Sequence, residues 1–216
     1  IPINSVEGFV RQVIGWREFI WNMYWREMPV MREANHLAAV RDLSPMFTDP
    51  STTKMRCMSR VLNDIHERAW VHHIPRLMIL GNFALTSGIQ PWQFTDWMWR
   101  SFVDAAEWVM APNVIGMSLY ADGGKVATKP YASGGAYIDK MSDFCKGCHF
   151  DRKARVGERA CPYTTLYWDF LLRHQESFVR NPRIAQQVRA AQKLSDVNDV
   201  RARADEVLGQ LDRGSL

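Results

Sequence analysis

The amino-acid sequence predicts an all-α domain. Apolar residues recur at helical spacing in several long segments, and no alternation of strands and helices of the βαβ type is visible. With 216 residues and 47% hydrophobic content, the chain can bury a core without disulfide staples. It contains no internal repeat, no P-loop and no dinucleotide-binding glycine motif.

The first predicted helix begins at Asn4, which pairs with Glu7 three residues later in the pattern of a capping box. Apolar residues follow at the spacing of one buried face, at Val6, Phe9, Val13, Trp16, Ile20 and Tyr24. Arg17 falls on the same face. A cation there is expected either to be paired or to hold an anion, or else to reach past the edge of the core into water.

A linker over 42–54, rich in Asp, Ser, Pro and Thr, precedes a second predicted helix over 55–69. A third helix is expected from Pro75, which suits a first turn, to Gly88, which suits a helix end. Thr95 and Asp96 predict the start of a fourth helix that runs to about Met110.

Residues 111–142 show no clean period and five glycines, which predicts a long ordered loop whose backbone approaches a ligand. Helical patterns return at 164–178 and at 183–213, and the last of these is charged and amphipathic. We therefore expect one domain over 1–180 and an amphipathic C-terminal helix over 181–216 packed on it.

The entrance of the third helix carries the sequence HHIPR. His72, His73 and Arg76 place titratable groups inside an otherwise apolar segment. A single histidine in such a place is usually a satisfied core residue, whereas two histidines with an arginine also fit a functional site. Both interpretations stay open on the sequence alone.

The cysteines are the most informative residues of the chain. Cys145, Cys148 and Cys161 lie within seventeen residues, Pro162 follows the last of them, and Cys57 is remote. A redox dithiol is expected near a βαβ pattern, which is missing. A close group that ends in Cys-Pro and has a distant fourth ligand is more typical of a [4Fe-4S] cluster than of zinc, although zinc and four unrelated thiols remain alternatives.

The formal net charge is +4 and the isoelectric point is about 9.0, which is compatible with a polyanionic partner. Five basic residues lie between the cysteines: Lys146, Arg152, Lys153, Arg155 and Arg159. They are expected either to offset the negative charge of a thiolate-ligated cluster and contact phosphate, or to belong to a solvated loop. The opening residues resemble no signal peptide, and no apolar run reaches the length of a membrane span, so a cytoplasmic location without membrane contact is expected.

Several motifs in order resemble one family, the bacterial iron-sulfur cryptochromes and photolyases, also called prokaryotic (6-4) photolyases. The motifs are RQVIGWREFIW, HHIPRLMILGNFAL, EWVMAPNVIGMSLYADGG, KPYASGGAYIDKMSDFCKGC and the final CP. The resemblance covers residues 4–180 and favours the [4Fe-4S] cluster at Cys57, Cys145, Cys148 and Cys161. It implies the C-terminal FAD-binding helical domain, without the family's N-terminal α/β antenna domain, on which a lumazine-type chromophore would be expected.

The resemblance also implies roles for individual residues. Those expected to contact FAD are Gln12, Trp16, Arg17, His73, Arg76, Gly116, Asp122 and Gly123, with the carboxylate of Asp122 paired to Arg76. His72 and His73 are expected to face the photoproduct as proton donors, and Trp97 is expected to pass electrons to FAD. Tyr131 and Tyr137 are expected at the lesion.

Two positions depart from the family pattern. Met110 stands where an acidic residue is expected beside the flavin, and Met98 stands where an aromatic residue is common. The expected function is blue-light-driven, FAD-dependent repair of a (6-4) pyrimidine photoproduct in UV-damaged DNA, by a bacterial protein acting as a monomer. The alternatives are a cryptochrome-type photoreceptor with signalling partners, and a non-photochemical nucleic-acid-binding iron-sulfur domain resembling the primase large subunit.

Overall fold

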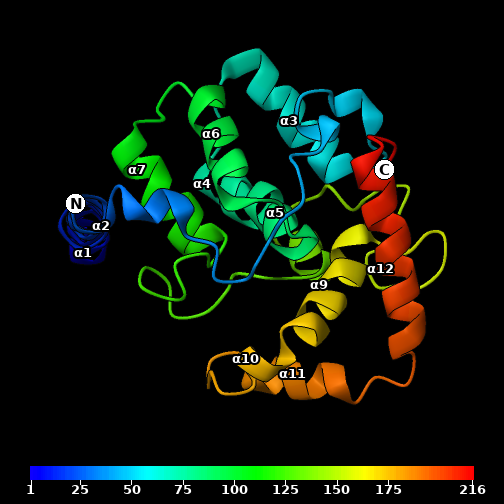
Figure 1. The fold of residues 1–216 in the computed structure, drawn as a ribbon. Helices are drawn as coiled ribbons and strands as arrows, with labels where there is room; N and C mark the ends of the chain where they lie inside the picture. Colours follow the sequence, from blue (N-terminus) through cyan, green and yellow to red (C-terminus); the bar gives the residue numbers. More distant parts are fainter.

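The computed structural model describes residues 1–216 as helices joined by loops, with two isolated bridges and no strand (Figure 1). The all-α prediction is thus confirmed. The α-helices are α1 (Ile3–Val10), α2 (Glu18–Glu27), α3 (Arg56–Arg68), α4 (His73–Pro75), α5 (Asn82–Ser87), α6 (Pro91–Ser101), α7 (Glu107–Ala111), α8 (Gly135–Met141), α9 (Pro162–Arg173), α10 (Gln175–Phe178), α11 (Ala185–Gln192) and α12 (Val197–Asp212).

Three π-helical segments join these helices into longer rods: η1 (Arg11–Arg17), η5 (Arg76–Gly81) and η6 (Pro112–Ser118). Three short 3-10 turns are η2 (Val30–Glu33), η3 (Pro45–Phe47) and η4 (Pro50–Thr52), of which the last two lie in the predicted linker. No helix is both long and apolar enough to cross a membrane.

The main core surrounds α9. Tyr163, Leu166 and Phe170 are fully buried on this helix, and α5, α11 and α12 pack against it. In Figure 1, α9 lies between α5 and α12, and α10 and α11 close the lower end of the molecule. A second, smaller core of seven buried residues, including Ile20, Leu77 and Met117, joins α2 to η5 and η6.

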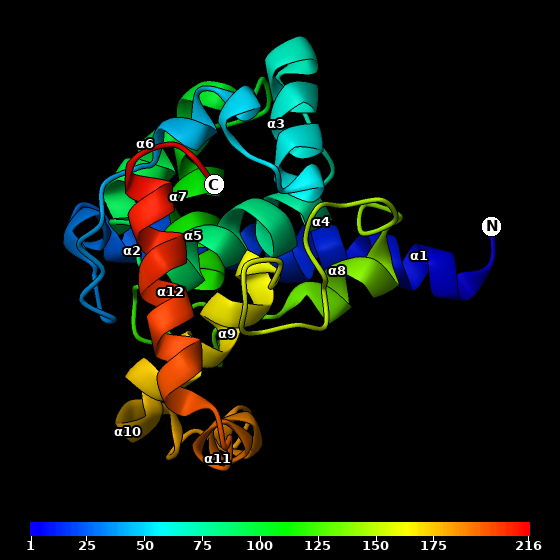
Figure 2. The ribbon, with the colours of Figure 1, turned by 90° about the vertical axis from the view of Figure 1, so that its right-hand side faces the viewer.

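The predicted buried face of the first helix is wrong over its first half. No residue of α1 or η1 is buried, and Val6, Phe9 and Val13 are exposed by 40%, 70% and 38%. Figure 2 shows the reason, because α1 projects away from the rest of the molecule, and contact with the smaller core begins at Trp16 and continues along α2. The capping box at Asn4 is also wrong, since the helix begins one residue earlier and no side chain caps it.

Three further boundaries differ from the sequence prediction. The helix expected over 95–110 begins instead at Pro91, where the Gln90 side chain accepts the Gln93 N–H, and it breaks over 102–106. The loop expected over 111–142 is helical as far as Ser118 and again from Gly135. The segment 183–213 forms α11 and α12 rather than one helix, because the chain turns at 193–196.

Candidate functional site

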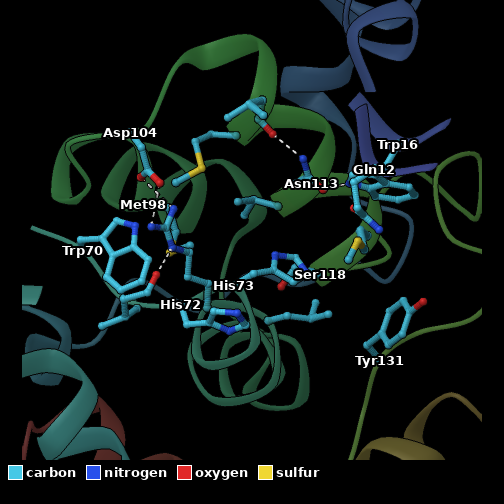
Figure 3. A pocket seen from close by; sticks show the side chains of 17 residues that line it. Gln12, Trp16, Trp70, His72, His73, Met98, Asp104, Asn113, Ser118 and Tyr131 are labelled. Atoms are coloured by element: carbon cyan, nitrogen blue, oxygen red, sulfur yellow. Dashed lines mark hydrogen bonds and ion pairs between the residues drawn. The ribbon is translucent and has the colours of Figure 1, made fainter. Parts of the chain in front are cut away.

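One cavity measures about 740 Å³, which lies in the range of cofactor and ligand pockets. Its wall is made of 17 residues from segments far apart in the sequence: Gln12, Trp16, Trp70, Val71, His72, His73, Arg76, Leu77, Met98, Asp104, Val109, Met110, Asn113, Val114, Met117, Ser118 and Tyr131. We call it the central pocket. In Figure 3, Trp70 and Asp104 lie on one side of it and Gln12, Trp16 and Tyr131 on the other.

All three π-helical segments contribute to this wall. Gln12 and Trp16 come from η1, Arg76 and Leu77 from η5, and four more residues from η6. A π-helical turn re-aims side chains relative to an α-helix and is frequent at functional sites. The indole N–H of Trp16 donates to the Asn113 side chain at 3.2 Å, which ties η1 to η6 across the wall.

His72 and His73 lie at the entrance of α4, as the sequence predicted, and both line the central pocket. The Nδ1 atom of His72 accepts the backbone N–H of Ile74 at 3.2 Å, so His72 caps the helix and its proton is carried on Nε2. Partial burial, together with the neighbouring His72 and Arg76, lowers the pKa of His73. The neutral form of His73 is therefore favoured near pH 7.

Arg76 is held by two partners on the protein. Its Nη1 and Nη2 atoms donate to the two carboxylate oxygens of Asp104 at 2.9 and 3.0 Å, and Nε donates to the carbonyl of Val71 at 2.8 Å. The guanidinium also lies over the ring of Phe102, 4.1 Å from its centroid. The expected pairing of Arg76 with Asp122 is wrong, because Asp104 takes both terminal nitrogens.

Asp122 instead shapes its own loop. Its two carboxylate oxygens accept the backbone N–H groups of Gly124 and Val126 at 2.9 and 2.8 Å. A Cβ atom on Gly116 would lie 2.6 Å from the Val126 side chain and 2.7 Å from the Asp122 carboxylate, so glycine is required there for close packing. Gly116, Asp122 and Gly123 do not line the central pocket.

Arg17 lies outside the central pocket as well. Its side chain is 56% exposed, donates to Glu18 at 2.7 Å and stacks over the ring of Trp108. Arg17 is therefore not buried on this face: its side chain reaches into water, and its expected pairing is made with Glu18 beside it.

Of the remaining residues considered in the sequence, some line the central pocket and others do not. Tyr131 lines the mouth of the central pocket, whereas Tyr137 packs against the smaller core. Trp97 is half-buried among Phe47, Phe94 and Phe102 and does not line the pocket; its neighbour Met98 does.

Sequence reasoning missed four polar or aromatic residues of the wall, namely Trp70, Asp104, Asn113 and Ser118. Asn113 lies in one of the motifs that resemble the family, so the sequence could have indicated it as a site residue. No sequence pattern indicated Asp104, because its role depends on its bond to Arg76, 28 residues earlier. The Ser118 hydroxyl is buried without any hydrogen-bond partner. Such an orphaned group in a pocket wall fits a polar ligand, which is consistent with a cofactor such as FAD.

The four cysteines are brought together. Cys57, Cys145, Cys148 and Cys161 are free thiols and line one small pocket with Met55, Gly135, Arg152 and Tyr163, among others. We call this the four-cysteine pocket. Cys57 comes from the first turn of α3 and Cys161 from the residue before α9. Thiols from four positions without disulfides are a suitable donor set for an iron-sulfur cluster.

No group of three or more His, Cys, Asp or Glu side chains is arranged around a point that could hold a single metal ion. Burial, with the negative charges of the neighbouring thiolates, raises the pKa of Cys57, and burial also raises that of Cys161. Burial, with Cys161 and Asp139, raises the pKa of Cys145 to about 11. The metal-free thiols of Cys57, Cys145 and Cys161 thus favour the protonated form, and a bound metal would reverse this by coordinating thiolates.

Comparison with known proteins identifies relatives over most of the chain. A (6-4) photolyase of Agrobacterium fabrum is 48% identical over 213 residues, which is 98% of this chain and 42% of the relative. An uncharacterized protein, R855, of Acanthamoeba polyphaga mimivirus is 33% identical over 101 residues, which is 47% of this chain and 75% of that protein. No family model matches. The resemblance predicted from the motifs is confirmed, and the chain spans less than half the length of the photolyase.

Proposed function

We propose that this chain, a relative of a (6-4) photolyase along 98% of its length, is the part of a light-driven flavoprotein that binds FAD and acts on UV-damaged DNA. One observation carries the proposal: His72, His73 and Arg76 converge with Gln12, Trp16 and Tyr131 on a single cavity of about 740 Å³. The substrate is a (6-4) pyrimidine photoproduct flipped out of the DNA strand.

When bound in reduced form and excited by blue light, FAD would supply the electron that splits the photoproduct. In this chain, Gln12, Trp16 and Arg76 would hold it, together with the unpartnered hydroxyl of Ser118. Arg76 keeps its charge beside the pocket while Asp104 and Val71 occupy its nitrogens. Its contribution is therefore a fixed pocket shape, because the Asp104 carboxylate offsets its charge.

The two histidines differ in what they can do. His72 is fixed by its helix cap and presents Nε2–H as its only ring donor. His73 favours the neutral form, because its pKa is lowered by burial and by nearby cations. An anionic photoproduct would raise that pKa again, so that His73 gains a proton when the substrate enters and can return it to the lesion.

Trp97 would act as an electron donor at a distance from the pocket. Its ring lies 6.5 Å from that of Phe102, which in turn packs under Arg76 in the pocket wall. Met98, the next residue along α6, lines the cavity. The four cysteines would hold a [4Fe-4S] cluster whose first role is structural, since the cluster would tie α3 to the start of α9.

A second candidate, a photoreceptor without repair, is favoured by Met110. This side chain is 5% exposed and lines the central pocket where the resembled family places an acidic residue. A thioether cannot accept or release a proton, so repair steps that need one at this place would fail.

The test uses the full-length protein, purified with its cofactor. A defined (6-4) photoproduct in an oligonucleotide is incubated under blue light and in darkness, and the intact lesion is quantified. Loss of lesion in light alone supports repair. Unchanged lesion with a light-dependent change in partner binding supports the photoreceptor, and absence of flavin absorbance in the purified protein contradicts both.

A further inference from the structure

The C-terminal helix α12 contacts the loop that ends at Cys161, and the residues after this helix contact the segment just before Cys57. In Figures 1 and 2, α12 runs along α9, and its end with the C-terminus lies toward α3. The four-cysteine pocket is built from Cys57 at the start of α3 and from the loop that ends at Cys161 before α9. The contacts at the two ends of α12 are specific and are described in turn.

At one end, α12 holds the loop over 151–161. Within this loop the N–H of Asp151 donates to the carbonyl of Arg159 at 2.7 Å, and the N–H of Cys161 donates to the carbonyl of Asp151 at 3.1 Å. Nη2 of Arg203 donates to the carbonyl of Glu158 at 2.8 Å. Two backbone hydrogen bonds therefore hold the loop together, and the bond from Arg203 attaches it to α12.

A second bond supports the same attachment. Arg155 donates from Nε to both carboxylate oxygens of Asp196, at 2.8 and 3.1 Å, just before α12 begins. From the opposite side, the hydroxyl of Thr165 on α9 donates to the carbonyl of Arg155 at 2.9 Å. The loop is therefore held between α9 and the N-terminal half of α12.

At the other end, the tail after α12 (residues 213–216) reaches the residues just before α3. The carbonyl of Leu216 accepts the N–H of Lys54 at 2.7 Å, and the Leu216 side chain is only 2% exposed. Met55 follows Lys54, lines the four-cysteine pocket and immediately precedes α3. The hydroxyl of Ser44 donates to the carbonyl of Leu211, which attaches the last turn of α12 to the segment before η3.

Arg203 is an unusual residue to place at such a contact. It is 7% exposed, its Nη1 donates to Glu206 at 2.9 Å, and its Nε is buried without a partner. Burial of a charged group with an unpaired nitrogen is costly, and an apolar residue would fill the space at lower cost. The long planar side chain does one thing that an apolar residue cannot, which is to bind the carbonyl of Glu158.

We propose that α12 with its tail is a clamp on the four-cysteine pocket and that Arg203 is its positioning residue. Arg203 touches no cysteine. It acts by fixing the loop over 151–161, which holds Cys161 at a constant position relative to Cys57. The Leu216 carbonyl fixes the segment that precedes Cys57 by its bond to Lys54. The inference rests on the proposed cluster site, and it concerns how long the cluster is retained.

The test compares Arg203→Met with Arg201→Met in the full-length protein. Arg201 is exposed on the same helix, so its variant removes the same charge without the contact to the loop. Iron content and the rate at which a chelator bleaches the cluster absorbance are measured. We expect Arg203→Met to lose the cluster about tenfold faster, which corresponds to about 1.4 kcal/mol, and Arg203→Lys to restore part of the retention. Equal rates in Arg203→Met and wild type would overturn the clamp.

A second readout does not depend on the cluster. In the metal-free protein, alkylation by iodoacetamide is followed at each cysteine by mass spectrometry, beside the urea midpoint of unfolding. Arg203→Met should speed labelling of Cys161 more than it shifts the midpoint, and deletion of Ser215 and Leu216 should speed labelling of Cys57. Uniform labelling that follows the midpoint contradicts the clamp. Wild-type protein that holds no iron contradicts the proposed cluster but leaves this readout to decide the clamp.

Discussion

The guanidinium of Arg76 and the carboxylate of Asp104 form two parallel hydrogen bonds of 2.9 and 3.0 Å in the wall of the central pocket. Parallel bonds of this kind fix orientation as well as distance. The side chain of Arg76 is 15% exposed, whereas that of Asp104 is 49% exposed. The pair therefore lies at the boundary between the pocket and the solvent.

This pairing predicts the outcome of two double-mutant cycles on the free energy of unfolding. Arg76→Met combined with Asp104→Asn should show a coupling energy of about 1 kcal/mol, because the two side chains share their bonds. Arg76→Met combined with Asp122→Asn should show almost none. Urea titrations of the single and double variants give both values. A larger coupling to Asp122 would mean that the sequence-based pairing was correct after all.

Ser118→Ala should affect the free and the liganded protein in opposite directions. Removing a buried hydroxyl without a partner should raise the free energy of unfolding of the cofactor-free protein by about 1 kcal/mol. The same change should weaken flavin binding if the hydroxyl contacts the cofactor. Thermal unfolding and flavin titration measure the two effects, with Ser87→Ala, whose hydroxyl bonds to the Phe83 carbonyl, as the destabilised control. A variant that is unchanged in both would contradict a ligand role for Ser118.

His72 can be separated from its role as a helix cap. His72→Asn keeps a side-chain acceptor for the N–H of Ile74, whereas His72→Ala removes it and should cost about 1 kcal/mol of stability. Both lose the imidazole. If Nε2 of His72 takes part in proton transfer, both variants should lose light-driven lesion turnover while only the alanine variant loses stability. Turnover that follows stability across the pair would assign His72 to structure alone.

His174 predicts a loss of stability in mild acid. Burial, together with the positive charges of Arg173 and His36, lowers the pKa of His174 from 6.5 to about 4, while Phe170 and Phe178 pack on its ring. Below pH 6.5 the unfolded chain therefore binds a proton that the folded chain resists, and stability falls until about pH 4. His174→Phe should flatten this part of the curve of unfolding free energy against pH. An unchanged slope in the variant would exclude His174 as its source.

Cys57→Ser should abolish the iron-sulfur absorbance and give a poorly soluble protein. Cys57 is buried and would supply the one proposed ligand that lies far along the chain from the other three, so a cluster without it could not tie α3 to α9. Iron analysis and the visible spectrum measure the loss. A brown, stable variant would show that Cys57 is dispensable.

The sequence by itself determined the helical class, the helix around Cys57, the end of the third helix at Gly88 and the residues at the entrance of α4. These features depend on local chemistry. Apolar periodicity gives the helix around Cys57, a left-handed glycine ends the third helix, and a His72 ring nitrogen accepts a backbone N–H at the entrance of α4. The spacing of the cysteines predicted one common site, and all four line one pocket.

Only the tertiary structure decided which charges meet. Asp104 rather than Asp122 pairs with Arg76 because α6 ends at Ser101 and the turn over 102–106 brings Asp104 beside the entrance of α4. No local sequence pattern encodes this path. The same holds for the first helix, whose apolar residues have helical spacing, although Val6, Phe9 and Val13 stay exposed and the face meets the protein only from Trp16 onward. Periodicity fixes what a segment forms, whereas burial and pairing depend on which distant segments arrive beside it.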